Sequence, residues 1–141
     1  MLEIRKPRSG AEWEELSEMR YDLLHKYLGF PKQRIVKGPS KISLLAFSGK
    51  KIVGTGTLIV EGKLGHIRYV AVERKSRHRK IGSRLVKRLE QVAKKKKLKM
   101  VYVNARKHAK KFFKELDFET KGDYFKHKKI GTLHIRMEKI L

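Results

Sequence analysis

The sequence predicts one mixed α/β domain over residues 1–141, built on a central, mostly antiparallel sheet with one parallel β-α-β crossover. Three observations carry this prediction. Strand-like segments joined by short glycine turns run from Ile42 to Val72, as in an antiparallel meander. An apolar stripe with helical spacing follows between residues 81 and 93, and Met100–Val103 is a continuously apolar strand of the kind covered on both faces. A strand, a helix and a strand in this order form a right-handed parallel crossover.

The first forty residues predict a short strand, a long helix and a loop. Leu2–Lys6 alternates apolar and charged residues, and Ser9 with Glu12 has the spacing of a capping box at a helix start. Gly29-Phe30-Pro31 ends the helix, and the aperiodic stretch to Ser40 is expected to face the substrate. The residues at helical intervals that predict the buried face of this helix are Trp13, Leu16, Met19, Leu23, Leu24 and Tyr27.

The meander contains three expected strands and two turns. Gly54 and Gly56 lie inside the second strand, where they predict a bulge or a close backbone approach, or are simply tolerated small residues. The segments in order are the strand with Ile42, Leu44 and Phe47, the turn Ser48-Gly49-Lys50, the strand Ile52–Val60, the turn Glu61-Gly62-Lys63 and the strand Leu64–Val72.

The last third of the chain predicts a helix and two closing strands. The helix is marked by Ala109, Phe112, Phe113 and Leu116, and the strands are expected over Phe118–Phe125 and Thr132–Ile140. In the final strand, Leu133, Ile135 and Met137 alternate with His134, Arg136 and Glu138, which is typical of a strand with one buried face.

The charge of the chain is strongly positive. The sequence has 37 Lys and Arg residues against 14 Asp and Glu, a formal net charge of +23. Thirteen of the cations lie between Arg74 and Lys99, where Glu90 is the one acid. Such a balance indicates phosphorylated cofactors, nucleic acid or an acidic surface as partners, or else a solvated cationic surface with no dedicated polyanion.

Several classes of protein are disfavoured by composition. The chain has no cysteine, which excludes disulfides, thiolate metal sites and a cysteine nucleophile. Its six histidines lack the spacing of a metal site, so no metal is expected. No apolar run approaches the roughly 20 residues that span a bilayer, and the N-terminus lacks a signal-peptide core, so we expect no membrane association and a cytoplasmic location.

The stretch from Val70 to Leu85 carries the strongest functional signal. It is expected to form a buried strand, a basic loop and the first turn of a helix. The unpaired amides and the dipole at a helix N-terminus both favour an anion. Gly82 lets the backbone approach a ligand without an intervening Cβ. The stretch therefore predicts a phosphate or pyrophosphate site.

These elements and motifs resemble the GNAT superfamily of N-acetyltransferases. Its signature, Arg or Gln, two residues, Gly, one residue, then Gly or Ala, is matched from Arg77 to Gly82, although Lys80 replaces the first glycine. Val103-Asn104-Ala105 followed by Phe112-Phe113-Lys114-Glu115-Leu116-Asp117-Phe118 is similar to the asparagine and the "Phe-Tyr-x-x-Leu-Gly-Phe" helix of the family. The ending from Gly131 to Met137 is similar to the small bacterial and archaeal branch typified by ElaA and YjcF.

The resemblance implies helices on both faces of the sheet and transfer of an acetyl group from acetyl-CoA to a primary amine, by direct attack in a ternary complex. The amine would belong to a small molecule, a protein lysine or an N-terminus. The strand before the loop would pair with the pantetheine arm, and a backbone N–H would polarise the thioester carbonyl. The implied cofactor-binding residues are Val70, Ala71, Val72, Arg77, His78, Arg79, Lys80, Ile81, Gly82, Ser83, Asn104, His108 and Phe112.

The resemblance also points to candidate acid and base groups. In the histone-acetylating branch a glutamate on the strand before the pyrophosphate loop is the base, and His66 occupies the comparable position. The usual general acid is the tyrosine of the Phe-Tyr pair, but here that residue is Phe113. Protonation of the thiolate would then come from solvent, Tyr124, His134 or His108.

Other functions remain open from the sequence. The basic stretch could serve a nucleic-acid-binding module, although aromatic residues are not interleaved with the cations. A non-catalytic acyl-CoA-binding member of the same family is a further alternative, because Phe113 has no proton to give. Acceptor recognition is expected from the Tyr27–Ser40 region and the Gly122–Gly131 connection, and a homodimer is implied only by the resemblance.

Overall fold

The computed structural model describes residues 2–128 and 131–141, apart from the side chain of His78. It contains one seven-stranded sheet with the strand order β1-β2-β3-β4-β5-β7-β6. Only β4 and β5 pair in parallel, and all other neighbours are antiparallel. This confirms the predicted sheet with its single parallel crossover. The strands are β1 (Leu2–Arg5), β2 (Lys41–Ser48), β3 (Lys51–Glu61), β4 (Leu64–Val72), β5 (Met100–Arg106), β6 (Glu119–Lys126) and β7 (Leu133–Ile140).

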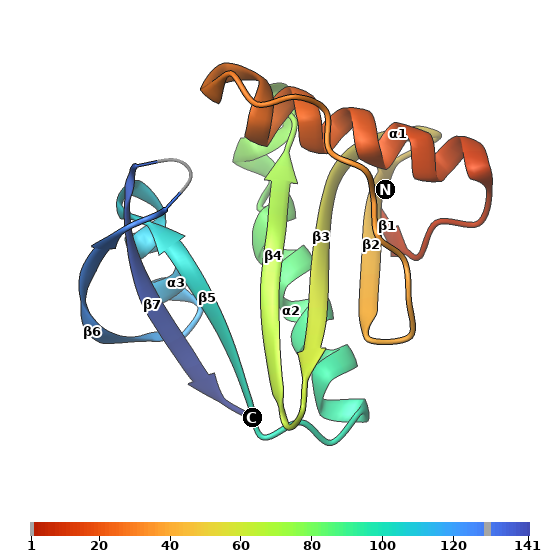
Figure 1. Cartoon of the computed structure of the whole chain (residues 1–141). Helices are drawn as coiled ribbons and strands as arrows, with labels where there is room; N and C mark the ends of the chain where they lie inside the picture. The colour runs from red at the N-terminus through yellow and green to blue at the C-terminus, as the bar shows by residue number, and fades with distance from the viewer. Residues whose placement is uncertain (1, 129–130) are drawn as a thin grey trace.

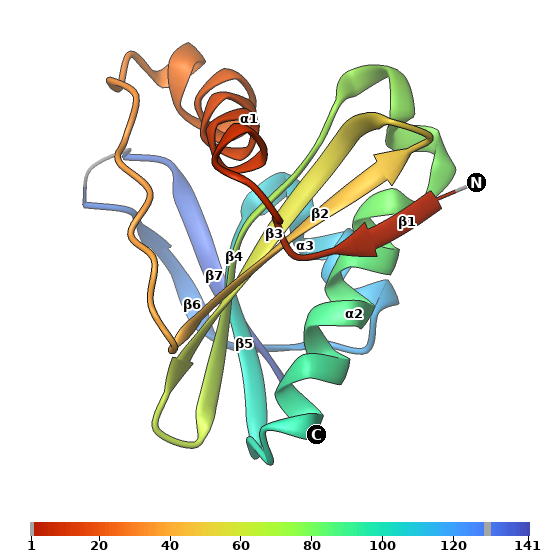
Figure 2. The same cartoon turned by 90° about the vertical axis from the view of Figure 1, so that its right-hand side faces the viewer.

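Helices cover both faces of the sheet, as predicted. They are α1 (Gly10–Arg20), α2 (Ile81–Lys95) and α3 (Lys110–Glu115), and Figure 2 shows α1 on one face and α2 on the other. The α1 face buries a small cluster of Leu16, Leu45, Phe47 and Ile52, whereas the larger core lies on the face of α2 and α3. Within the described residues, none of the helices combines the length and apolar character of a membrane span.

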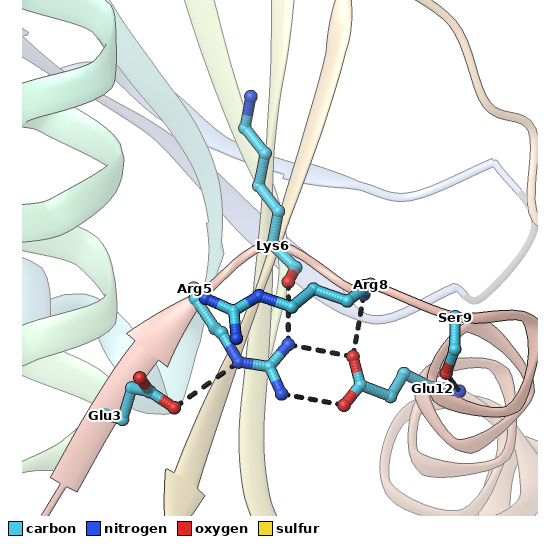
Figure 3. Close-up of polar contacts among 6 residues, drawn as sticks. All are labelled: Glu3, Arg5, Lys6, Arg8, Ser9 and Glu12. Atoms are coloured by element: carbon cyan, nitrogen blue, oxygen red, sulfur yellow. Dashed lines mark hydrogen bonds and ion pairs between the residues drawn. The ribbon is translucent and has the colours of Figure 1, made fainter.

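The start of α1 is fixed to β1 by a cluster of hydrogen bonds (Figure 3). Ser9 caps the helix, because its Oγ accepts from the Glu12 N–H at 3.2 Å. The Glu12 carboxylate accepts from both Arg5 Nη atoms at 2.8 Å and from the Arg8 N–H at 2.7 Å, one residue earlier than in the predicted capping box. The bonds from Arg5 and Arg8 lower the pKa of Glu12 to about 2.

The predicted first helix changes type before it ends. A π-helical turn, Tyr21–His25, follows α1, and a 3₁₀ turn, Lys26–Leu28, ends at Gly29 in the left-handed region at φ 76°. The π turn shifts the helical phase. The prediction that Tyr27 lies on the buried face is therefore wrong: it is 62% exposed, with the Arg106 guanidinium 5.6 Å from its ring centroid.

Two glycines of β3 allow α2 to pack closely on the sheet. A Cβ on Gly54 would lie 3.0 Å from Leu85 Cδ1, and one on Gly56 would lie 3.2 Å from Leu89 Cδ1. Gly56 is also opposite a bulge, because the pairing with β4 shifts between Thr55 and Thr57. The predicted close approach is confirmed for both glycines, whereas the bulge opposite Gly56 lies in β4.

The closing strands depart from the predicted alternation at one position. Ile135 and Met137 are buried as expected, but His134 is only 5% exposed, whereas Leu133 is 39% exposed. The His134 ring is covered by the Phe125 ring of β6 and by His127, at centroid distances of 6.0 and 5.2 Å. The prediction that β7 buries a single face is therefore wrong at this end of the strand.

Candidate functional site

The two parallel strands separate partway along the sheet. β4 pairs with β5 only through Leu64, Gly65 and His66, which are opposite Met100, Val101 and Tyr102. Beyond His66 the strands diverge, as Figure 1 shows, while β5 continues to pair with β7 up to Arg106. Among the described residues, no strand pairs with the facing edges of β4 and β5 past this point. Their backbone groups are available to a ligand that enters between the strands.

A bulge in β4 lies directly beside this opening. Tyr69 and Val70 are together opposite the single residue Gly56, between the pairs Thr57–Arg68 and Thr55–Ala71. Tyr69 has φ 58°, which costs a non-glycine residue on the order of 1–2 kcal/mol. A bulge of this kind redirects backbone N–H groups away from the sheet, in this case beside the diverging strands.

The end of β4 leads into the N-terminus of α2 through a 3₁₀ turn, Arg74–Arg79. Arg77 Nε donates to the Val72 carbonyl at 3.1 Å, and Arg79 Nη1 donates to Ser48 Oγ at 3.0 Å, so these two side chains brace the turn. Lys80 follows in the left-handed region, at φ 57° and ψ 30°, and its side chain makes no capping hydrogen bond. The first amides of α2 therefore have no side-chain cap among the described residues.

The structure gathers most of the predicted cofactor-binding residues in one place. The strand end Val70–Val72 and the turn and helix start 77–83 are joined by residues 73–76, and a Cβ on Gly82 would lie 3.4 Å from Phe112 Cζ and 3.7 Å from Val72 Cγ2. Ile81 is fully buried, so only its backbone can serve a ligand. Asn104 is exposed on β5, and His108 is exposed in the 3₁₀ turn Lys107–Ala109 that follows β5. The side chain of His78 lies outside the described part of the chain.

His66 lies at the point where β4 and β5 part. Its ring stacks on Tyr102 with centroids 4.3 Å apart, and its Nδ1 is 3.8 Å from Glu61 Oε2. Burial, together with the charges of Arg68 and Arg136, lowers the pKa of His66 to about 4, against the opposing effect of Glu61. The imidazole is consequently neutral at pH 7, able to accept a proton but only weakly basic.

The other two predicted catalytic residues lie away from His66. Tyr124 is on β6, three strands from β4 in the sheet, and the ammonium groups of Lys107 and Lys110 lie 5.9 and 5.5 Å from its ring. His134 is opposite Arg106, four residues along β5 from Tyr102, or about 13 Å at the usual rise of a strand. The three residues therefore do not form one hydrogen-bonded unit.

Sequence reasoning missed a cavity on the α1 face, beside β4. It measures about 140 Å³, and Gln33, Arg34, Ile35 and Val36 contribute from the predicted substrate-facing loop. Arg20 and Arg68 also line it, and neither was singled out from the sequence. The helical period could have identified Arg20, because it follows Leu16 by four residues on the buried face of α1. The described residues of the Gly122–Gly131 connection do not line the cavity, and residues 129 and 130 lie outside the described chain.

Comparison with known proteins agrees with this geometry. Residues 15–141 match the family model described as "Acetyltransferase (GNAT) domain". The structure of ElaA from Escherichia coli superposes with a TM-score of 0.84 and 18% identity over 99% of both chains. An acyl-CoA N-acyltransferase from Pseudomonas aeruginosa gives a TM-score of 0.80 and 17% identity, covering 99% of this chain and 98% of that one.

A third similar structure is an aminoglycoside 6'-N-acetyltransferase complexed with coenzyme A. Its TM-score is 0.79 at 17% identity, and the match covers 98% of this chain and 96% of that chain. Identities this low concern the fold alone, whereas the family match extends over most of the sequence. The chain therefore belongs to the GNAT acetyltransferase family, whose fold supports acyl transfer from coenzyme A thioesters.

Proposed function

We propose that this protein transfers the acetyl group of acetyl-CoA to a primary amine, by direct attack in a ternary complex. The observation that carries the proposal is the parting of β4 and β5 after His66, next to the uncapped N-terminus of α2. The opening offers unpaired strand edges to the amide groups of a pantetheine arm. The helix start offers amides and a positive dipole to a pyrophosphate.

Backbone groups would do most of the phosphate binding. Arg77 and Arg79 already donate to Val72 and Ser48, so their first role is to hold the turn in shape. The exposed cations Arg74, Lys75 and Lys80 remain to attract the phosphates of the substrate. The amides of Gly82 and Ser83 lie at the helix start, where a phosphate would be bound.

The chemistry requires an oxyanion donor and a proton acceptor. The bulge at Tyr69 and Val70 would supply the backbone N–H that stabilises the developing oxyanion of the thioester carbonyl. His66, neutral at pH 7, would accept the proton of the attacking amine directly or through water. Phe113 packs against Phe118 and has no proton to give, so we assign protonation of the leaving thiolate to solvent. A thiol has a pKa near 8.5, which makes the thiolate a tolerable leaving group.

The test is calorimetric titration with acetyl-CoA of the natural protein and two variants at Gly82. Gly82→Ala should bind normally, because a Cβ there makes only an ordinary contact with Phe112, at 3.4 Å. Gly82→Trp should lose at least tenfold in affinity, because its ring must occupy the space beside Phe112 and Val72. Circular dichroism establishes that both variants are folded. Absence of binding by the natural protein, or equal binding by both variants, would refute the proposal.

A further inference from the structure

We infer that the acceptor amine carries an anionic group, a carboxylate or a phosphate, and that Arg20 and Arg68 bind this group in the cavity on the α1 face. The inference rests on the proposed function, because it takes this cavity as the acceptor side of the reaction. At about 140 Å³, the cavity is similar in size to cavities that hold one benzene molecule, which suits a small head group.

The walls of the cavity carry an unbalanced positive charge. Its lining includes the cations Arg20, Arg34, Lys41 and Arg68, and no Asp or Glu is among the described residues that line it. Charged side chains that leave water are ordinarily paired with an opposite charge. Among these cations, Arg20 is buried, whereas Arg34 and Arg68 are exposed. Arg20 has no carboxylate partner among the described residues that line the cavity, so a bound anion would complete its surroundings.

Arg20 is the most deeply placed of these cations. It is 9% exposed, and its Nη2 donates to the hydroxyls of Thr57 and Ser43 at 2.5 and 3.4 Å. Its Nε is buried and has no hydrogen-bond partner among the described residues. The guanidinium thus has neutral partners and an unused donor. Since a guanidinium presents several N–H groups in a planar fork, it is suited to a carboxylate or phosphate.

Arg68 brings a second guanidinium to the same place. The Tyr69 ring has Arg20 at 4.2 Å and Arg68 at 4.7 Å from its centroid. Burial, and to a lesser extent Arg68, lowers the pKa of Arg20 to about 10. Burial followed by Arg20, Arg106 and Arg68 lowers the pKa of His25, whose buried Nδ1 also lacks a partner in the described residues. Burial is the larger cause of both shifts, Tyr69 opposes the shift of Arg20, and the neighbouring guanidinium groups add to both; a bound oxyanion would oppose the contribution of those cations.

The position of the cavity limits the size of the acceptor. Arg68, which is opposite Thr57, lies two residues beyond His66 on β4. At the usual rise of a strand, the two residues are about 7 Å apart. An amine that reacts near His66 while its anion contacts Arg68 therefore needs only a short spacer. β-Alanine and phosphoethanolamine, whose groups are separated by two carbon atoms, are suitable probes of the two anions.

The first experiment measures anion binding without catalysis. Inorganic phosphate and acetate are titrated into the ¹⁵N-labelled protein, and the amide shifts of Thr57 and Arg68 are followed separately from those of the α2 N-terminus. Arg68→Met should weaken binding at Thr57 at least tenfold, and Arg68→Lys should restore part of it. Arg88→Met is the matched control. It removes the same charge from the protein, but Arg88 is exposed on α2, outside the cavity. Equal weakening by both methionine variants would overturn the inference.

The second experiment measures acetyl transfer to matched amines. If the anion is a carboxylate, kcat/KM for β-alanine should be at least tenfold higher than for the neutral β-alaninamide. If it is a phosphate, kcat/KM for phosphoethanolamine should be at least tenfold higher than for ethanolamine. The acidic amine with the higher kcat/KM identifies the anion. Arg68→Met should abolish this preference through KM, whereas Arg88→Met should preserve it. Preference for the neutral amines would overturn the inference while leaving acetyl transfer intact. Failure to bind acetyl-CoA would instead refute the proposed function, and the phosphate titration would still test the cavity.

Discussion

Lys80 offers a direct test of backbone strain in the turn that leads into α2. It has φ 57° at the N-cap of α2, where a non-glycine residue costs about 1–2 kcal/mol. Lys80→Gly removes this cost but gives the unfolded chain additional freedom worth about 0.4–1 kcal/mol. The difference between these two ranges centres on about 0.8 kcal/mol in the free energy of unfolding, or about 3 °C in Tm for a chain of this size. Urea unfolding followed by the fluorescence of Trp13 measures it.

Two controls separate strain from charge. Lys80→Ala removes the same cation but keeps the Cβ, so it should not reproduce the stabilisation. Lys97→Gly should stabilise to a similar extent, because Lys97 is also an exposed lysine with positive φ, at 60°. If Lys80→Ala stabilised the protein as much as Lys80→Gly, relief of charge repulsion would be the cause. The positive φ of Lys80 would then not destabilise the fold.

Two further predictions concern buried ionisable groups. Glu90 is 5% exposed, and its Oε1 forms an ion pair with Lys139 Nζ at 2.7 Å. Glu90→Gln should therefore destabilise the fold by about 1–3 kcal/mol in urea, whereas the double variant Glu90→Leu/Lys139→Met should recover most of the loss. A double variant as unstable as the single one would contradict this. The pKa of His66 falls from 6.5 to about 4, so unfolding takes up a proton between these pH values and stability should decrease as the pH is lowered through them. An NMR titration should place the His66 midpoint below 5, and a midpoint at or above 6.5 would exclude the buried, cation-flanked environment.

Most of the secondary structure followed from local sequence. Glycine turns at Gly49 and Gly62 and the apolar stripe of α2 depend on nearby residues, because turn conformation and helical period are local properties. The order strand, helix, strand then limits the crossover to a right-handed parallel one. The first helix was predicted less well, because no pattern in the sequence signals its π turn, and Tyr27 after that turn faces solvent.

The candidate cofactor site could also be predicted from the sequence. The turn from Arg77 to Gly82 is contiguous in the chain, so a short motif identifies both the helix start and the position at which a bulky side chain would meet Phe112 and Val72. The replacement of glycine by Lys80 was visible as well, but its positive φ became evident only in the structure.

The sequence alone therefore determined the element order, the sheet class and the position of the candidate phosphate site, all of which depend on patterns within a few residues. The tertiary structure decided the parting of β4 and β5, because it depends on pairing between Leu64–His66 and Met100–Tyr102, which are far apart in the chain. It also decided the surroundings of Arg20, one of 37 basic residues in the sequence. Only folding brings this guanidinium beside Thr57 and Tyr69 and leaves it without a carboxylate partner among the described residues, since side-chain electrostatics depend on distance in space.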